Sequence, residues 1–287
     1  MDGKAILMGL AFGLMWASAF TSARVIVQYA PPLYALAFRF LLSGVFGVFL
    51  ARMMGQSWHL TRRQWVAVLV FGISQNALYL GLNFIAMQTI EASLAAIVAS
   101  TMPLLVGVAS WLVFGEKIRP LGIAGLVAGM IGVALIMGAR LQGTVDLFGL
   151  GLCVVAVISL TVATLSVRGA SSGGNFLMIV GLQMLVGSAM LWIPALAFET
   201  FDVTWSWQLI VAFTYTVIVP GLGATLIWFY LVDRIGATPA AVFHFLTPFF
   251  GVSIAAMLLG EKLGSMDIIG VLIITGGILA VQLSKQR

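Results

Sequence analysis

Charge is what this chain has least of. Only 8% of its 287 residues are Asp, Glu, Lys or Arg, whereas 62% are hydrophobic; a soluble domain carries about 25% charged residues. No soluble fold of this length hides so much apolar surface, so the surrounding solvent must be lipid. Inside a bilayer the backbone polar groups must be bonded within the chain, which leaves helices or closed barrels. The apolar runs are long and do not alternate, so the sequence predicts an all-α integral membrane protein.

Cysteine and deep carboxylates are also scarce. The single cysteine, Cys153, excludes an internal disulfide and a cysteine metal cluster, and the sequence predicts neither a metal site nor a cofactor. No Asp or Glu lies deep in an apolar run. Because carboxylates in the midplane usually carry protons or cations, their absence argues against an exchanger of cations for protons and favours a substrate without net charge. The basic residues are scattered between apolar runs, which argues against a nucleic-acid surface.

Ten apolar segments have the length of a membrane-crossing helix, which needs roughly 20 residues. The predicted spans are 5–27, 33–52, 65–87, 92–114, 121–139, 147–167, 176–198, 208–231, 238–258 and 266–283.

The distribution of Lys and Arg sets the orientation of these spans. Ten basic residues fall on the side of the N-terminus and three on the opposite side. The ten are Lys4, Arg52, Arg62, Arg63, Lys117, Arg119, Arg168, Arg234, Lys285 and Arg287, and the three are Arg24, Arg140 and Lys262. This separation predicts that both termini are cytoplasmic.

The chain repeats itself at a spacing of 145 residues. Residues 92–132 overlay residues 237–277 without a gap, and each copy carries a Pro followed twelve residues later by Gly-Glu-Lys. The identical pairs include Ala92/Ala237, Ala95/Ala240, Ala96/Ala241, Pro103/Pro248, Gly115/Gly260, Glu116/Glu261, Lys117/Lys262, Gly125/Gly270 and Gly132/Gly277. We interpret the match as a duplication, with residues 1–142 and 143–287 as the two halves.

Each half holds five spans, so the second half must enter the membrane upside down relative to the first. Two inverted repeats around a central cavity can exchange conformations and expose a midplane site to each side in turn. The sequence therefore predicts a transporter that works by alternating access. The alternative is that duplication only enlarged a membrane protein without giving it this mechanism.

Three motifs resemble the drug/metabolite transporter superfamily, specifically its EamA-type ten-helix exporters. They are Trp16 with Ala17-Ser18-Ala19-Phe20, then Phe38-Arg39-Phe40-Leu41-Leu42, and the duplicated Ala-rich start, Pro and Gly-Glu-Lys. Within that superfamily the sequence is most similar to bacterial aromatic amino-acid exporters. The resemblance implies a bacterial inner-membrane protein. It also implies a cavity lined by helices one, three, four, six, eight and nine, with helices five and ten as outer supports.

Helix-breaking residues lie in the middle of three spans. Pro103 and Pro248 lie at equivalent positions of the two halves, and the eighth span contains Pro220 followed by Gly221. A proline inside a helix removes a backbone hydrogen bond and bends it. These four residues are the predicted hinges, with ordinary helix kinks as the alternative.

Polar and aromatic side chains recur at helical spacing in several spans and predict the lining of the cavity. The candidate substrate-binding residues are Trp16, Gln75, Asn76, Tyr79, Asn83, Ser159, Thr164, Thr225, Trp228, Phe243 and His244. The alternative for this set is hydrogen bonding between helices. His244 is interpreted as a neutral hydrogen-bond partner rather than a proton carrier. Arg39, inside the second span, is given a structural role, with a substrate carboxylate as the alternative.

The predicted function is export of small neutral metabolites, most of all aromatic or hydrophobic amino acids. A multidrug or organic-cation exporter is the second hypothesis, with aromatic rings binding the cation. A non-transporting scaffold or an intramembrane hydrolase is the third. The Gly-x-Ser-x-Gly pattern at Gly169–Gly173 has no strand before it and is not interpreted as catalytic. No enzymatic activity is predicted, the partners are a small-molecule substrate and the lipid bilayer, and the protein is expected to be a monomer or a homodimer.

Overall fold

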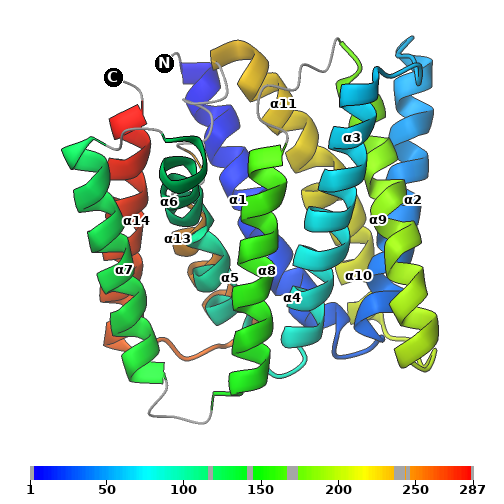
Figure 1. Ribbon diagram of the computed structural model, residues 1–287. Helices are drawn as coiled ribbons and strands as arrows, with labels where there is room; N and C mark the ends of the chain where they lie inside the picture. Colours follow the sequence, from blue (N-terminus) through cyan, green and yellow to red (C-terminus); the bar gives the residue numbers. More distant parts are fainter. Residues whose placement is uncertain are drawn as a thin grey trace.

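A computed structural model describes residues 3–115, 119–140, 145–166, 174–235, 243 and 246–285. All regular structure in these segments is helical. The helices run side by side between two ends of one bundle, and α1 begins at the end where α14 finishes (Figure 1). In the first half they are α1 (Gly3–Ile26), α2 (Pro32–Met53), α3 (Arg62–Phe71), η1 (Gly72–Tyr79), α4 (Leu80–Ala86), α5 (Ala92–Ser100), α6 (Met102–Phe114) and α7 (Pro120–Arg140). In the second half they are α8 (Leu147–Ser166), α9 (Phe176–Phe198), α10 (Trp207–Thr216), η2 (Val217–Gly223), α11 (Ala224–Ile235), α13 (Thr247–Leu259) and α14 (Ser265–Lys285).

Seven helical segments in the described part of the chain are long and apolar enough to cross a membrane. They coincide with seven of the predicted spans and make this a multi-pass membrane protein. Three shorter apolar helices, Pro120–Ile136, Thr247–Leu259 and Ser265–Val281, lie where the other three spans are predicted. The first residues of the ninth predicted span lie outside the described residues, so the count of ten crossings stays a prediction.

The lipid-facing side of the bundle is apolar. Large side chains such as Met257, Leu258 and Phe198 are 83%, 72% and 85% exposed. Exposing so much apolar surface to water would cost free energy, and this cost is avoided when lipid hydrocarbon covers the helices.

Helix irregularities recur at the repeat spacing. The third span passes through a π-helical segment that begins at Gly72, and the eighth span does so from Val217, 145 residues further on. The fourth span is interrupted at Thr101, and α6 begins at Met102; α13 begins at the equivalent residue, Thr247. Each new helix carries its proline, Pro103 or Pro248, at its second position, where the missing N–H would be unbonded in any case. Helices therefore begin beside Pro103 and Pro248, while the role of these prolines as hinges stays a prediction.

The glycine of each Gly-Glu-Lys motif ends a helix. Gly115 follows α6 with φ of 64°, and Gly260 follows α13 with φ of 67°. This left-handed conformation is one that glycine adopts without a steric penalty and that terminates α-helices. The duplicated glycine thus has a backbone role in both halves.

The fifth helices of the two halves, α7 and α14, pack against each other in opposite directions. A β-carbon added to Gly125 would lie 2.6 Å from the carbonyl oxygen of Gly277, and one added to Gly132 would lie 2.8 Å from that of Gly270. Later residues of α7 thus contact earlier residues of α14, so the two helices are antiparallel. Since Gly125 and Gly270 are repeat equivalents, as are Gly132 and Gly277, the contact is reciprocal. The glycines of α7 therefore allow a close approach to a helix of the same chain.

The second helices of the two halves, α2 and α9, form a similar antiparallel pair. A β-carbon on Gly181 would lie 2.7 Å from the backbone nitrogen of Val48. Toward the other end of the pair, the hydroxyl of Ser188 donates to the carbonyl of Ala37 at 2.8 Å. Equivalent helices of the two halves therefore run in opposite senses at two places, as an inverted repeat requires.

Carboxylates tie the halves together at the end of the bundle where α1 finishes. Glu199, after α9, accepts hydrogen bonds from the backbone N–H groups of Leu33 and Tyr34 at the start of α2. Asp146, just before α8, accepts a 2.6 Å hydrogen bond from the hydroxyl of Thr89. This bond, together with the N–H groups of Gly149 and Phe148, holds the pKa of Asp146 below its ordinary value, although desolvation acts the other way. These contacts fix the start of α2 and the start of α8 at this end of the bundle.

Candidate functional site

A small cavity lies inside the bundle, in the half toward the end of α1. Its volume is about 50 Å³, which is room for a few water molecules, since each needs at least about 10–15 Å³. The wall comes from five spans: α1, α2, the η1–α4 segment, α9, and the η2–α11 segment. It consists of Trp16, Ala19, Phe20, Ala23, Arg39, Phe40, Gln75, Asn76, Tyr79, Leu80, Asn83, Phe84, Met87, Met184, Pro220, Gly221 and Thr225.

Helical periodicity explains which residues reach the cavity. On α1 the lining residues are Trp16, Ala19, Phe20 and Ala23, spaced as one face of a helix. The polar face of α1 turns elsewhere, because the hydroxyl of Ser18 lies 2.7 Å from that of Tyr215.

The two π-helical segments face this cavity from the two halves of the chain. Gln75, Asn76 and Tyr79 come from η1, and Pro220 and Gly221 come from η2. A π-helical turn leaves the i→i+4 pattern and often occurs at functional sites. Because Pro220 lacks an N–H, it accounts for the irregularity in η2.

The polar groups of the wall are only partly satisfied. Asn76 donates through Nδ2 to the carbonyl of Gln183 at 2.9 Å, and Asn83 donates to the carbonyl of Tyr79 at 2.8 Å. The side-chain oxygen of Asn83 is buried and accepts no hydrogen bond from a described residue. Thr225 donates to the carbonyl of Gly221 at 2.7 Å. The cavity therefore offers an unoccupied acceptor beside aromatic surface.

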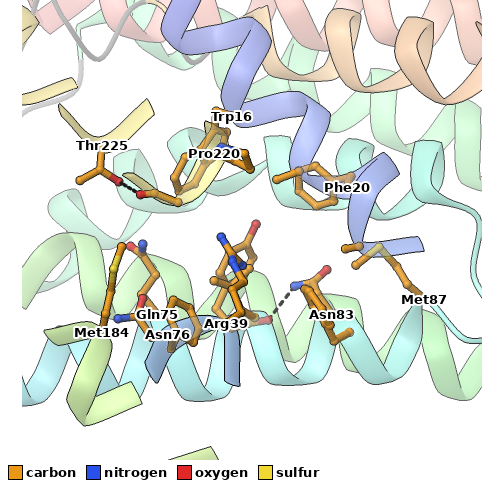
Figure 2. A pocket seen from close by; sticks show the side chains of 17 residues that line it. Trp16, Phe20, Arg39, Gln75, Asn76, Asn83, Met87, Met184, Pro220 and Thr225 are labelled. Atoms are coloured by element: carbon orange, nitrogen blue, oxygen red, sulfur yellow. Dashed lines mark hydrogen bonds between the residues drawn. The ribbon is translucent and has the colours of Figure 1, made fainter. Parts of the chain in front are cut away.

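Arg39 supplies the charge of the cavity. Its side chain is only 6% exposed, its Nε atom has no hydrogen-bond partner, and its guanidinium lies 5.0 Å from the ring centroid of Phe40. Figure 2 shows it between Asn76 and Asn83, across the cavity from Trp16 and Pro220. Within the described chain Arg39 forms no ion pair or hydrogen bond, and its guanidinium contacts Phe40. The structural role therefore stays a prediction.

Gly221 lies close to the preceding turn of its own span and to α2. A β-carbon at this position would lie 3.0 Å from the carbonyl oxygen of Thr216, 3.4 Å from the hydroxyl of Ser43 and 3.9 Å from Nη2 of Arg39. A larger side chain here would enter the space beside Arg39.

Comparison with known sequences identifies the protein class. The EamA-like transporter family matches the chain over residues 3–138 and again over residues 147–283. The chain belongs to this family. It is therefore a membrane transporter whose two halves each match the same family, in agreement with the duplication found in the sequence.

Named relatives of this EamA-like transporter include uncharacterised and characterised proteins. An uncharacterised transporter of Bacillus subtilis, YvbV, is 28% identical over 93% of this chain and 88% of its own length. The aromatic amino acid exporter YddG of Ancylobacter novellus is 30% identical over 49% of this chain and 48% of its own. A solved crystal structure superposes with a TM-score of 0.72 and 19% identity over 100% of both chains, which shows the fold.

The cavity of this EamA-like transporter brings together eight of the residues singled out from the sequence. They are Trp16, Gln75, Asn76, Tyr79, Asn83, Thr225, Pro220 and Gly221. All come from the first, third and eighth spans. The wall also contains residues that were not among the predicted substrate-binding residues, among them Arg39, Phe40, Phe20, Met87 and Met184. For Arg39 the signal was present, because an ionisable residue inside a span is itself unusual.

Ser159 and Thr164 do not line this cavity. Ser159 donates to the carbonyl of Val155 at 3.1 Å, and Thr164 donates to that of Leu160 at 2.8 Å. Both hydroxyls are satisfied by the preceding turn of α8, as serine and threonine commonly are inside helices.

Trp228 and Phe243 lie in a different cluster. The ring of Trp228 stacks 4.8 Å from that of Phe12, and Phe243 is buried in the same cluster with Ala5. Both therefore pack near the start of α1 and not in the cavity wall. His244 lies outside the described residues, as do Glu116, Lys117 and the Gly169–Gly173 pattern. Pro103 and Pro248 begin helices away from the wall.

The set of helices around the cavity differs from the one implied by the resemblance. Spans one, three and eight contribute as expected, but the described residues of spans four, six and nine do not, and spans two and seven take their place. All nine residues of α5 pack against neighbouring helices, and none of them is among the residues that line this cavity. The resemblance implies that helices five and ten, which are α7 and α14, lie outside the cavity as supports. This agrees with their packing against each other at one side of the bundle (Figure 1).

Proposed function

We propose that this transporter exports small neutral metabolites, above all aromatic or hydrophobic amino acids, from the cytoplasm by alternating access. The observation that carries the proposal is the cavity between the two halves, where aromatic rings stand beside amides. Trp16, Phe20, Tyr79 and Phe84 offer ring surfaces, each worth about 0.5–1.5 kcal/mol against an aromatic partner. Asn76 and Asn83 add polar groups that orient a ligand.

The shape of the cavity supports a moving site. At about 50 Å³ it is too small for an aromatic amino acid, so binding requires the wall to open. The wall includes α1 but no described residue of its repeat equivalent, α8. The two halves therefore surround the cavity unequally, which is what alternating access between inverted repeats produces.

The likeness to the aromatic amino acid exporter YddG supports the choice of substrate class. That likeness covers half of the chain, so the choice depends equally on the aromatic wall of the cavity.

Flux measurements in proteoliposomes test this proposal. The purified protein is expected to move labelled phenylalanine or tryptophan, and Gly221→Leu or Tyr79→Ala is expected to lower the rate at least about tenfold, the loss of roughly 1.4 kcal/mol. The first change fills the cavity and the second removes a buried wall residue that is 2% exposed.

Gly151→Leu is the matched control, because Gly151 is exposed on α8 and has no neighbour within 4 Å of an added β-carbon. Wild-type protein that moves no amino acid would overturn the proposal. Full flux in both cavity variants would remove this cavity from the transport path.

A further inference from the structure

We infer that Arg39 is the carboxylate-binding residue of the cavity and that the transported molecule carries a carboxylate, as a zwitterionic amino acid does. This inference rests on the proposed function, transport through this cavity, and names the group on the substrate that the site recognises. The starting observation is an arginine that is 6% exposed, that forms no hydrogen bond or ion pair with a described residue, and that lines a cavity.

An unpaired guanidinium inside a membrane bundle requires compensation. A charge in this environment costs several kcal/mol unless it is paired or hydrogen-bonded. The ring of Phe40, 5.0 Å from the guanidinium, offsets only part of this, since a cation–π contact contributes roughly 0.5–2 kcal/mol. The rest of the compensation must come from water or from a ligand in the cavity.

The described residues around Arg39 offer it no anion. None of the described cavity residues is Asp or Glu. The carboxylates of Glu199 and Glu261 bind backbone N–H groups at the ends of α2 and α5, and that of Asp146 binds Thr89. No described residue of the cavity supplies an anionic partner for Arg39, and we assign that role to a ligand. A carboxylate fits, because the planar guanidinium presents parallel N–H donors that match two carboxylate oxygens.

A second pair of buried groups indicates where an ammonium group would bind. The side-chain oxygen of Asn83 and the hydroxyl of Ser43 are both buried without a hydrogen-bond partner in the described structure. Asn83 lines the cavity, and Ser43 lies one helical turn from Arg39 on α2. With a carboxylate on Arg39, an α-ammonium group can donate to the oxygen of Asn83. Arg39 and Asn83 together recognise the carboxylate and the ammonium group of a zwitterion.

The same charge distinguishes between two substrate classes. A fixed positive charge in a low-dielectric cavity repels an organic cation and attracts an anion or the carboxylate of a zwitterion. Arg39 therefore disfavours the multidrug or organic-cation hypothesis.

Ligand binding to the detergent-purified full chain tests the inference without requiring flux. The probes are phenylalanine, 3-phenylpropionate, which lacks the amine, and phenethylamine, which lacks the carboxylate. We expect the first two, but not the third, to raise the thermal midpoint of the wild-type protein. In Arg39→Gln the affinity for both carboxylates is expected to fall roughly ten- to hundredfold, as for the loss of a charge-assisted hydrogen bond. Arg39→Lys keeps the positive charge but loses the paired N–H donors of the guanidinium, so its affinity is expected to lie between those of the wild type and Arg39→Gln.

Arg52→Gln is the matched control, because it makes the same change on the same helix at an exposed residue that stacks on Trp58. It is expected to bind like the wild type. Equal carboxylate binding by Arg39→Gln and wild type, or wild-type stabilisation by phenethylamine alone, would overturn the inference.

Flux measured on the same preparations keeps the two proposals separate. Carboxylate binding that depends on Arg39, without phenylalanine flux, would sustain the binding site and contradict the proposed transport of amino acids. Phenylalanine flux with the same half-saturating concentration in wild type and Arg39→Gln would support the proposed transport and contradict the role of Arg39 as the carboxylate-binding residue. If Arg39→Gln misfolds, the test uses Arg39→Lys in its place. It also uses the selectivity of the wild type among the three probes, which the inference predicts as well.

Discussion

At the scale of single residues, adjacent glycines in this protein have different roles. Gly276 and Gly277 follow each other on α14, yet a β-carbon on Gly276 would meet nothing within 4 Å. One on Gly277 would lie 2.6 Å from the carbonyl oxygen of Gly125 and 2.7 Å from the backbone nitrogen of Gly129. Backbone atoms cannot rotate away as a side chain can. Only Gly277 is therefore required for the approach of α7 and α14.

Alanine substitutions at these two positions are expected to have opposite effects. Gly277→Ala should destabilise the protein by about 1–3 kcal/mol, as an overpacked contact does, whereas Gly276→Ala should be neutral or stabilise by up to about 1 kcal/mol through helix propensity. Thermal unfolding in detergent gives the measurement, with each variant serving as the other's control. Equal midpoints for the two variants would contradict the tight α7–α14 contact.

At the scale of elements, the Gly-Glu-Lys motif acts through both its glycine and its glutamate. Gly260 ends α13, and Glu261 then accepts hydrogen bonds from the backbone N–H groups of Ala92 at 2.8 Å and Ser93 at 3.0 Å. These are donors at the start of α5 that have no partner within the helix. The motif of the second half thus caps a helix of the first half, at the end of the bundle where α1 finishes.

Removing this cap should weaken that end of the bundle. Glu261→Ala is expected to cost about 0.5–2 kcal/mol, the usual loss for a helix N-terminus without its acceptor, and Glu261→Gln less, because an amide oxygen still accepts. Thermal midpoints measured beside Lys262→Ala, an exposed neighbour, provide the comparison. A Glu261→Ala protein as stable as Lys262→Ala would show that the cap contributes nothing.

The same scale shows what local sequence predicts well. Seven of the predicted spans and the irregular helix segments beside Pro103 and Pro220 were found in the sequence, because each depends on nearby residues. Span ends generally fall within a few residues of the helices observed. The capping by Glu261 could not be predicted, since it joins residues 169 positions apart.

At the scale of the whole molecule, two antiparallel contacts between equivalent helices give the halves opposite senses. α7 begins at the end of the bundle where α1 begins, whereas its equivalent, α14, begins at the opposite end (Figure 1). In a membrane the loops after α6 and α13 must then face different compartments. The bias of Lys and Arg predicts that the loop after α6 is cytoplasmic.

Cysteine labelling tests this arrangement. In a Cys153→Ala background, which removes a single buried thiol, the exposed residues Arg119 and Lys262 are changed one at a time to cysteine. A membrane-impermeant maleimide should label Lys262→Cys in intact spheroplasts and Arg119→Cys only after lysis, because each site faces one compartment. Labelling of both variants before lysis would place the two loops on the same side and contradict the inverted repeat.

The cavity wall shows what helical spacing can and cannot predict. Gln75, Tyr79 and Asn83 were predicted to line a cavity because their spacing on a helix is visible in the sequence. Trp228 shares that pattern, yet it stacks on Phe12, because a helical face indicates burial but not the neighbour that covers it. Arg39 was visible as an unusual charge inside a span, but its lack of an anionic partner among the described residues appears only when the surrounding helices are assembled.

The sequence by itself determined that the chain lies in lipid, that it is helical, and that it consists of two copies with opposite orientation, because composition, periodicity and repeat spacing are properties of the chain read in order. Only the tertiary structure decided which spans surround the cavity, which acid caps which helix, and that a guanidinium remains unpaired beside aromatic rings. Those properties depend on contacts between distant segments, and such contacts are fixed by the packing of whole helices rather than by any local run of residues.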